Sequence, residues 1–77
     1  MGTERESITK EVGSRIRYAR KSRGMSMDEL AQAIYKTRSA ISKYENGQIS
    51  VDIATLYDIA NALKISIYDL LHRNTPD

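Results

Sequence analysis

Two helix start signals lie close together in the middle of the chain, and they constrain the fold more than any other feature. Ser26 and Glu29 have the spacing of a capping box, in which each side chain accepts a hydrogen bond from the other residue's backbone N–H. Met25 and Leu30 stand around this box as a hydrophobic staple. Thr37 then offers its hydroxyl as the next N-cap. The chain is therefore expected to form two consecutive helices joined by very few residues.

These two helices are expected to turn sharply against each other. The first should end around Tyr35–Lys36, and the second should run over Arg38–Glu45 and close at Asn46–Gly47, a pair suited to a left-handed C-cap. Ala31 supplies a small side chain where the two helices cross, and Ile41 turns an apolar side chain inward. This arrangement has the geometry of a helix-turn-helix.

Three further helices complete the expected fold, and no alternating apolar and polar run supports a strand. A helix should open near Ser7 and run to about Ser22, where Gly24 stops it. Asp52 caps a helix that continues to about Leu63, and Ser66 with Asp69 opens a short last helix. We therefore expect an all-α fold of five helices.

The length of 77 residues allows one core and one domain. We expect a flexible N-terminal tail over residues 1–6, the helical domain over 7–72 and a C-terminal tail over 73–77. No apolar run is long enough for a membrane span, and the absence of a signal pattern and of cysteine predicts a cytoplasmic protein. The core must rest on aliphatic side chains, for which the candidates are Ile8, Ile16, Leu30, Ile34, Ile41, Ile53, Leu56, Ile59, Leu63, Ile65 and Leu70.

Positive charge is concentrated in one part of the chain, although the formal net charge is only +2. Residues 10–48 hold nine lysines and arginines against four acidic residues, a net charge of +5. Residues 49–77 hold two against four, a net charge of −2. One end of the molecule should therefore attract phosphate groups.

The outward face of the helix over residues 38–45 carries the chemistry that points to a function. Arg38, Ser39, Ser42 and Lys43 point away from Ile41, and they combine short hydroxyls with two long cationic donors. Arginine and lysine can donate to O6 and N7 of guanine, and serine can bond several bases. The face therefore favours contact with base edges in a major groove.

Three segments together resemble the Cro/XRE-type family of phage-repressor helix-turn-helix proteins. They are Arg15-Ile16-Arg17 with Gly24, Ser26-Met27-Asp28-Glu29-Leu30-Ala31, and the run from Ser39 to Gly47, and the match covers about Val12 to Leu71. The resemblance implies a compact five-helix, lambda-repressor-like domain whose third helix enters the major groove of double-stranded DNA. It also implies a dimer on near-palindromic operators, acting as a bacterial or phage transcription regulator, most simply a repressor.

The resemblance also assigns roles to individual positions. It implies that Arg20 pairs with Glu45 inside the domain and ties the first helix to the end of the third. It implies that Ser26 and Met27 start the second helix beside a phosphate, and two basic side chains complete the predicted phosphate contacts, Arg15 and Lys36. The residues implied to face bases are Arg38, Ser39, Ser42 and Lys43.

Three positions depart from the family pattern. Tyr35 stands where relatives have a glycine in the left-handed turn, at a cost of about 1 kcal/mol if that geometry is kept. Lys36 replaces a valine that packs inward, and its methylene stem can cover the core while its ammonium reaches out. Met27 replaces a glutamine and cannot make that residue's hydrogen bonds. The turn that aims the third helix is therefore the least typical part of the motif.

The last helix carries more apolar surface than one short helix can bury, which predicts a homodimer. The expected interface residues are Ile65, Ile67, Tyr68 and Leu71. Two copies related by a two-fold axis would contact half-sites about 10 base pairs apart.

Other classes of function find less support. With no cysteine, one histidine and no glycine-rich phosphate loop, no catalytic group can be assembled, and we expect no enzyme, cofactor, metal or small-molecule ligand. The alternative from another class is an adaptor that uses the same fold to bind a protein. DNA binding through several phosphates should weaken steeply with salt, whereas a flat response would favour the adaptor.

Overall fold

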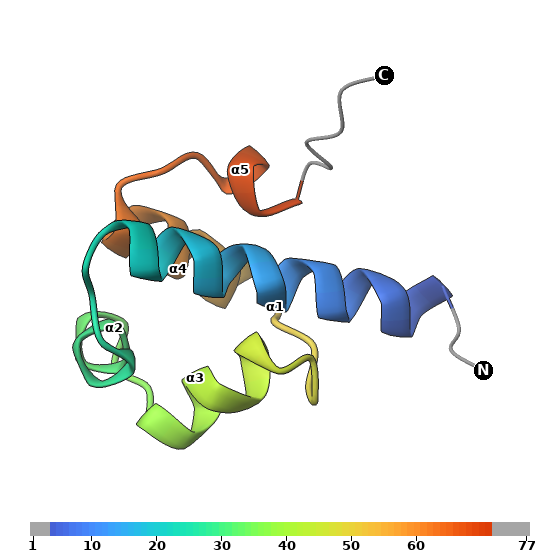
Figure 1. Cartoon of the computed structure of the whole chain (residues 1–77), viewed down its shortest axis with the longest axis horizontal. Coiled ribbons are helices and arrows are strands. Elements are labelled where there is room, and N and C mark those ends of the chain that lie inside the picture. The colour runs from blue at the N-terminus through green and yellow to red at the C-terminus, as the bar shows by residue number, and fades with distance from the viewer. Residues whose placement is uncertain (1–3, 72–77) are drawn as a thin grey trace.

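α1 is the long helix against which three of the other helices pack (Figure 1). The computed structural model describes residues 4–71, which form α1 (Glu4–Ser22), α2 (Met27–Ala33), α3 (Arg38–Glu45), α4 (Ile53–Leu63) and α5 (Ile67–Leu71). No strand occurs in this part of the chain, so the predicted all-α fold of five helices is confirmed. None of the described helices is both long and apolar enough to span a membrane.

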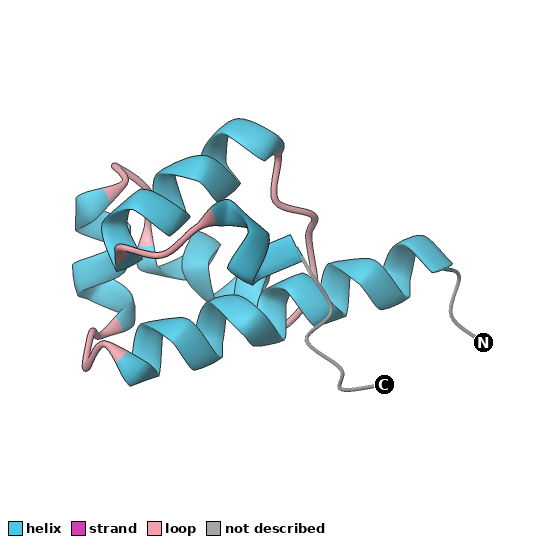
Figure 2. Cartoon of the chain, turned by 90° about the horizontal axis from the view of Figure 1, so that it is seen from above, coloured by secondary structure: helices cyan, strands magenta, loops and turns pink. Residues whose placement is uncertain are grey.

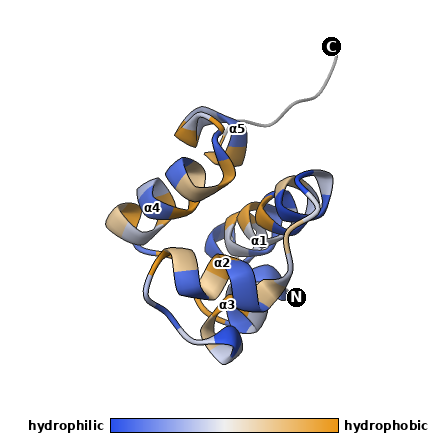
Figure 3. Cartoon of the chain, turned by 90° about the vertical axis from the view of Figure 1, so that its left-hand side faces the viewer, coloured by the Kyte–Doolittle hydropathy of each residue, from blue (hydrophilic) through white to orange (hydrophobic). Residues whose placement is uncertain are grey.

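The helices enclose one aliphatic core. Apolar stretches of α1, α4 and α5 turn toward the space between these helices (Figure 3). The large side chains that are fully buried are Ile16, Leu30, Ile41, Ile59, Leu63 and Leu70. The prediction that Ile8 and Ile53 belong to the core was wrong, because their side chains are 53% and 66% exposed. Both have helical spacing to buried neighbours, but α1 extends past the other helices at its N-terminal end (Figures 1 and 2), and Ile53 is the first residue of α4.

The helix start signals of the sequence are present as hydrogen bonds. The Ser26 hydroxyl accepts from the Glu29 N–H at 3.0 Å, and the Glu29 carboxylate accepts from the Ser26 N–H at 2.7 Å. The Thr37 hydroxyl accepts from the Ala40 N–H at 3.0 Å. These caps satisfy backbone donors that have no partner inside their helices. They fix where α2 and α3 begin.

Asp52 caps α4 through both of its carboxylate oxygens. They accept from the Thr55 hydroxyl at 2.7 Å and from the Thr55 N–H at 3.1 Å. These bonds stabilise the ionised carboxylate and lower the pKa of Asp52 below its ordinary value. The positive charge of Lys36 lowers the same pKa to a smaller extent.

α1, α2, α3 and α4 all end in the same way, with one residue in the left-handed backbone region. In each case the next residue donates its N–H back to a carbonyl in the last turn, at distances between 2.9 and 3.1 Å. The left-handed residues are Gly24, Tyr35, Gly47 and Lys64. Tyr35 therefore keeps the backbone geometry for which relatives use glycine, with φ of +59°.

Two helix boundaries differ from the sequence expectation. α1 begins at Glu4, three residues before the expected start at Ser7, so residues 4–6 are helical rather than part of a tail. α2 ends at Ala33 rather than near Tyr35–Lys36, because the left-handed conformation of Tyr35 cannot continue a helix. Residues 1–3 and 72–77, with the expected tail over 73–77, lie outside the described residues.

Gly13 lets α1 approach the C-terminal end of α3 closely. A Cβ atom built on this buried glycine would lie 2.3 Å from the backbone oxygen of Tyr44 and 2.9 Å from that of Glu45. No side chain can occupy that space without moving the backbone of α3. The distance between α1 and α3 therefore depends on a residue with no side chain.

We expect Gly13→Ala to lower the free energy of unfolding by about 1 to 3 kcal/mol, because the added methyl overlaps backbone atoms of α3. At an exposed helical site the same change would raise stability by about 1 kcal/mol, so the sign of the effect is diagnostic. Urea unfolding followed by circular dichroism measures it. Ser14→Ala at the neighbouring exposed site is the control, and a stabilised G13A variant would contradict the close approach.

We expect Tyr35→Gly to raise the free energy of unfolding by about 0.5 to 1 kcal/mol, because glycine adopts a positive φ without strain. Tyr35 is 94% exposed, so its side chain contributes little packing that could be lost. Tyr18→Gly removes another largely exposed tyrosine (76%) from a helical position in the C-terminal half of α1, and it should destabilise by about 1 kcal/mol. Equal effects of the two changes would show that Tyr35 is not strained.

Candidate nucleic-acid interface

The turn between α2 and α3 brings the beginnings of both helices to one side of the molecule. Ala31 is buried where α2 packs against α3, as expected for a crossing that needs a small side chain. Arg38 in the first turn of α3 lies 3.8 Å from the Asp28 carboxylate in the first turn of α2, and both side chains are about two-thirds exposed. The two helix N-termini therefore form one continuous exposed surface.

The inner face of α3 is anchored by three buried residues. Ile41 is fully buried, and Tyr44 and Glu45 are nearly so. The Glu45 carboxylate accepts from Nε of Arg20 at 2.6 Å and from Nη2 at 3.0 Å. The remaining Nη1 donates to the carbonyl of Met25 at 2.8 Å. One guanidinium thus connects α1, the start of the α2 region and the end of α3.

This ion pair is fully hydrogen-bonded within the protein. The hydrogen bond with Glu45 raises the pKa of Arg20 above its ordinary value, which burial alone would lower. Among the described residues no buried side-chain nitrogen or oxygen lacks a hydrogen-bond partner. The pair is the one that the family resemblance implies, and it holds α3 from the side opposite its polar face.

The outer face of α3 presents the predicted base-contacting residues. Arg38, Ser39 and Lys43 are exposed, and Ser42 is half-buried. The Ser42 hydroxyl lies 3.4 Å from the side-chain amide of Asn46, which can donate to it. The structure therefore brings hydroxyl, amide, guanidinium and ammonium groups together on one helix face.

The predicted phosphate contacts are only partly brought to this surface. Ser26 is exposed at the start of α2, and Lys36 is exposed between α2 and α3. Met27 is half-buried and packs against the core, so it contributes apolar contact rather than a polar group.

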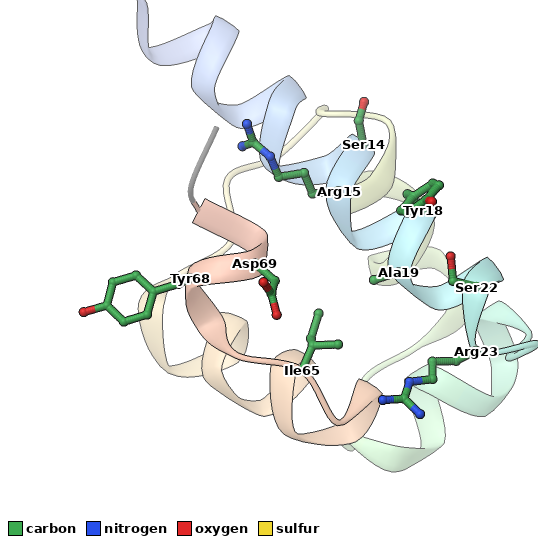
Figure 4. Close-up of a pocket in the computed structure, with 9 residues that line it drawn as sticks. All are labelled: Ser14, Arg15, Tyr18, Ala19, Ser22, Arg23, Ile65, Tyr68 and Asp69. Atoms are coloured by element: carbon green, nitrogen blue, oxygen red, sulfur yellow. The ribbon is translucent and has the colours of Figure 1, made fainter. Parts of the chain in front are cut away.

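Arg15 lies elsewhere. It lines a groove of about 1060 Å³ between α1 and α5 (Figure 4). Its guanidinium pairs with the Glu11 carboxylate at 3.6 Å. Its position on α1 is roughly opposite Gly13, which faces α3. The structure therefore does not bring Arg15 to the outer face of α3.

One basic side chain near α3 was missed by the sequence analysis. Lys10 of α1 lies against Gly47, in the turn that follows α3. Lys10 is one of the nine basic residues counted over residues 10–48. Its contact with Gly47 could not be predicted from the sequence, because the two residues are far apart in the chain. Asn46 and Gln48 in the same turn are exposed.

The four residues predicted for a dimer interface do not form one patch. Ile65 and Tyr68 line the groove between α1 and α5 (Figure 4). Leu71 lines a different hollow near the start of α1, and Ile67 is half-buried against the core. Helical spacing alone could not separate these surfaces.

Comparison with known proteins agrees with this geometry. A helix-turn-helix family model, HTH_3, matches residues 16–70. The chain belongs to this Cro/C1-type family. Its members are DNA-binding transcription regulators rather than enzymes, and the predicted lambda-repressor-like fold and family are thereby confirmed.

Several family members are similar in sequence or structure. A transcriptional regulator in the ATPase CF(0) region of Rhodospirillum rubrum is 38% identical over 56 residues, which are 73% of this chain and 52% of that protein. The chain thus spans about half the length of this relative. The controller protein C.AhdI of Aeromonas hydrophila is 30% identical, with a TM-score of 0.80 and coverage of 83% of this chain and 97% of that chain. The P22 c2 repressor bound to a synthetic operator is 28% identical, with a TM-score of 0.73 and coverage of 79% and 92%.

We expect Glu45→Ala to lower the free energy of unfolding by about 3 to 5 kcal/mol, because it leaves the Arg20 guanidinium buried without a counter-charge. Thermal and urea unfolding measure the loss. Asp28→Ala removes the acid of the exposed Arg38 pair and should cost less than about 1 kcal/mol. The double variant Arg20→Met/Glu45→Leu should recover most of the lost stability, and a mild effect of Glu45→Ala alone would argue against a buried pair.

Proposed function

We propose that this protein is a sequence-specific regulator of transcription that binds double-stranded DNA with α3 in the major groove. It acts as a homodimer on a near-palindromic operator in the cytoplasm of a bacterium, with repression as its simplest outcome. The observation that carries the proposal is the outer face of α3. Three of its four side chains are exposed and all four can form hydrogen bonds, while the opposite face of the same helix is buried in the domain.

The chemistry of this face favours base contacts over an ordinary solvated helix surface. Arg38 and Lys43 can each donate to O6 and N7 of guanine, and Ser39 can donate to or accept from several bases. Ser26 and Lys36 flank this face at the start of α2 and in the turn, where backbone phosphates pass beside a helix in the major groove. The exposed cations Lys36, Arg38 and Lys43, with Lys10 of α1 against the turn after α3, add electrostatic attraction to DNA.

The relatives support the same interpretation. The P22 c2 repressor, with its 28% identity, is bound to a synthetic operator, and C.AhdI is a restriction-modification controller protein. The family model matches residues 16–70, which include the whole α2–turn–α3 unit and most of the described chain.

Selection of bound sites from random duplex DNA tests the proposal directly. An inverted repeat with half-sites about 10 base pairs apart is the expected result, since it matches a two-fold dimer. Recovery of no consensus sequence would contradict sequence-specific binding. A flat dependence of binding on salt would instead favour the protein adaptor, because DNA binding through several phosphates releases counterions and weakens steeply.

We expect Arg38→Ala and Lys43→Ala each to weaken binding to the selected site by about 1 to 3 kcal/mol and to relax base preference at one position. Fluorescence anisotropy with the selected duplex and with single-base variants measures both effects. Arg15→Ala is the matched control, because it removes the same charge from the groove between α1 and α5. A uniform loss on all sequences would reassign the mutated residue to a phosphate contact.

A further inference from the structure

An acidic residue lies on the surface that is proposed to face DNA. Asp28 stands in the first turn of α2, and its carboxylate oxygen Oδ1 lies 3.8 Å from Nε of Arg38 in the first turn of α3. The Asp28 side chain is 70% exposed and that of Arg38 is 67% exposed. A carboxylate repels the phosphates of DNA, so an acid at this place opposes binding through its charge. Its contact with Arg38 is the feature that can offset this cost.

The ion pair engages one side of the Arg38 guanidinium and leaves its end free. A guanidinium has one N–H on Nε and four on its two terminal nitrogens. Within residues 4–71 neither terminal nitrogen of Arg38 donates to another protein group. Two terminal N–H groups can donate to O6 and N7 of one guanine in a bidentate contact. Asp28 and a guanine can therefore bind the same guanidinium at the same time.

The distance between the two residues is set by rigid parts of the fold. The capping box fixes the start of α2, and the hydroxyl of Thr37 fixes the start of α3. Ala31 is buried where the two helices pack against each other. Asp28 and Arg38 both stand in the first turns that these caps define. The carboxylate is therefore a fixed point against which a long and flexible side chain can be oriented.

The electrostatic surroundings of Arg38 increase the effect of this acid. Arg38 is the first residue of α3, where the helix dipole disfavours a cation. Lys36 and Lys43 are further exposed cations near the same helix. The first turn of α2 favours the negative charge of Asp28 for the opposite reason. Asp28 thus attracts a guanidinium that its other neighbours repel.

We propose that Asp28 is a positioning residue for base recognition, which orients the Arg38 guanidinium so that both terminal nitrogens face one guanine. This role rests on the proposed binding of α3 in the major groove, and Asp28 itself touches no base. The role has two effects of opposite sign. The charge of Asp28 lowers the affinity for DNA of any sequence, while the orientation of Arg38 raises the preference for one base pair. An exposed acid with no such role has only the first effect.

Asp28→Asn tests the proposal, because it removes the charge and keeps the shape and the preference for the start of a helix. Fluorescence anisotropy compares an unrelated duplex, the selected duplex and variants of the base pair that Arg38→Ala identifies. We expect affinity for the unrelated duplex to rise about 2- to 5-fold. Discrimination at the Arg38 base pair should fall about 3- to 10-fold and stay unchanged elsewhere. Asp58→Asn, at an exposed site on α4, changes the net charge equally and should leave all discrimination unchanged.

A double-mutant cycle shows whether Asp28 acts through Arg38. In the Arg38→Ala background, Asp28→Asn should no longer change discrimination at that base pair. Unchanged discrimination in the Asp28→Asn single variant would overturn the proposal. Increased discrimination would do the same, since Asp28 would then hold Arg38 away from the base. Equal losses at several base pairs would also overturn it, because they would indicate a shift of the whole of α3.

NMR relaxation of the Arg38 Nε–H group in the protein without DNA separates this proposal from the proposed function. We expect Asp28→Asn to lower the order parameter of this group, because the guanidinium loses its anchor. The Nε–H group of Arg17, an exposed arginine on α1, should be unaffected. Absence of any sequence preference in the wild-type protein would reject the proposed function. An Arg38 Nε–H group that is equally mobile in both proteins would overturn the positioning role, whatever the DNA measurements show.

Discussion

The buried ion pair between Arg20 and Glu45 is the contact on which the position of α3 depends. Removing two charges from water is unfavourable, and this cost is offset only when every donor and acceptor finds a partner. The guanidinium reaches Glu45 with two nitrogens and the Met25 carbonyl with the third. All three bonds form only when α1, the connection to α2 and the end of α3 are in place together. The pair therefore fixes the position of α3 through its inner face. The outer face of α3 does not contribute to this contact.

The ends of the helices show a second constraint, because four of them need one residue with a positive φ. Gly24 and Gly47 adopt this conformation without strain, whereas Tyr35 and Lys64 adopt it against the preference of their side chains. The hydrogen bonds that close α2 and α4 require it, since the following N–H must turn back to the last turn of its helix. Local strain at Tyr35 is thus the condition for the short turn that places α3.

Local signals in the sequence predicted most of the fold, and long-range contacts account for what they missed. Caps at Ser26, Thr37 and Asp52 are read from a few neighbouring residues, so the starts of α2, α3 and α4 could be predicted. Gly13 gave no such signal, because the atoms that exclude a side chain there belong to α3. The same limit explains the wrong placement of Ile8 and Ile53 in the core: helical spacing tells which residues share a face, but not how far a neighbouring helix extends along it.

For the candidate site, the polar face of α3 could be predicted from its helical spacing relative to Ile41, the residue that turns inward. The separation of Arg15 from that face depends on how α1 packs between α3 and α5.

The burial of Tyr44 has a consequence for how this protein can be observed. The chain has no tryptophan, and its other four tyrosines are all more than half exposed. Tyr44 is nearly inaccessible to water, and its backbone oxygen is the atom closest to Gly13. The near-ultraviolet absorption and circular dichroism of the folded protein should therefore differ from those of the unfolded chain mainly through Tyr44, whose phenol lies at the junction of α1 and α3. The natural sequence thus contains an optical reporter of the docking of α3, and it needs no label.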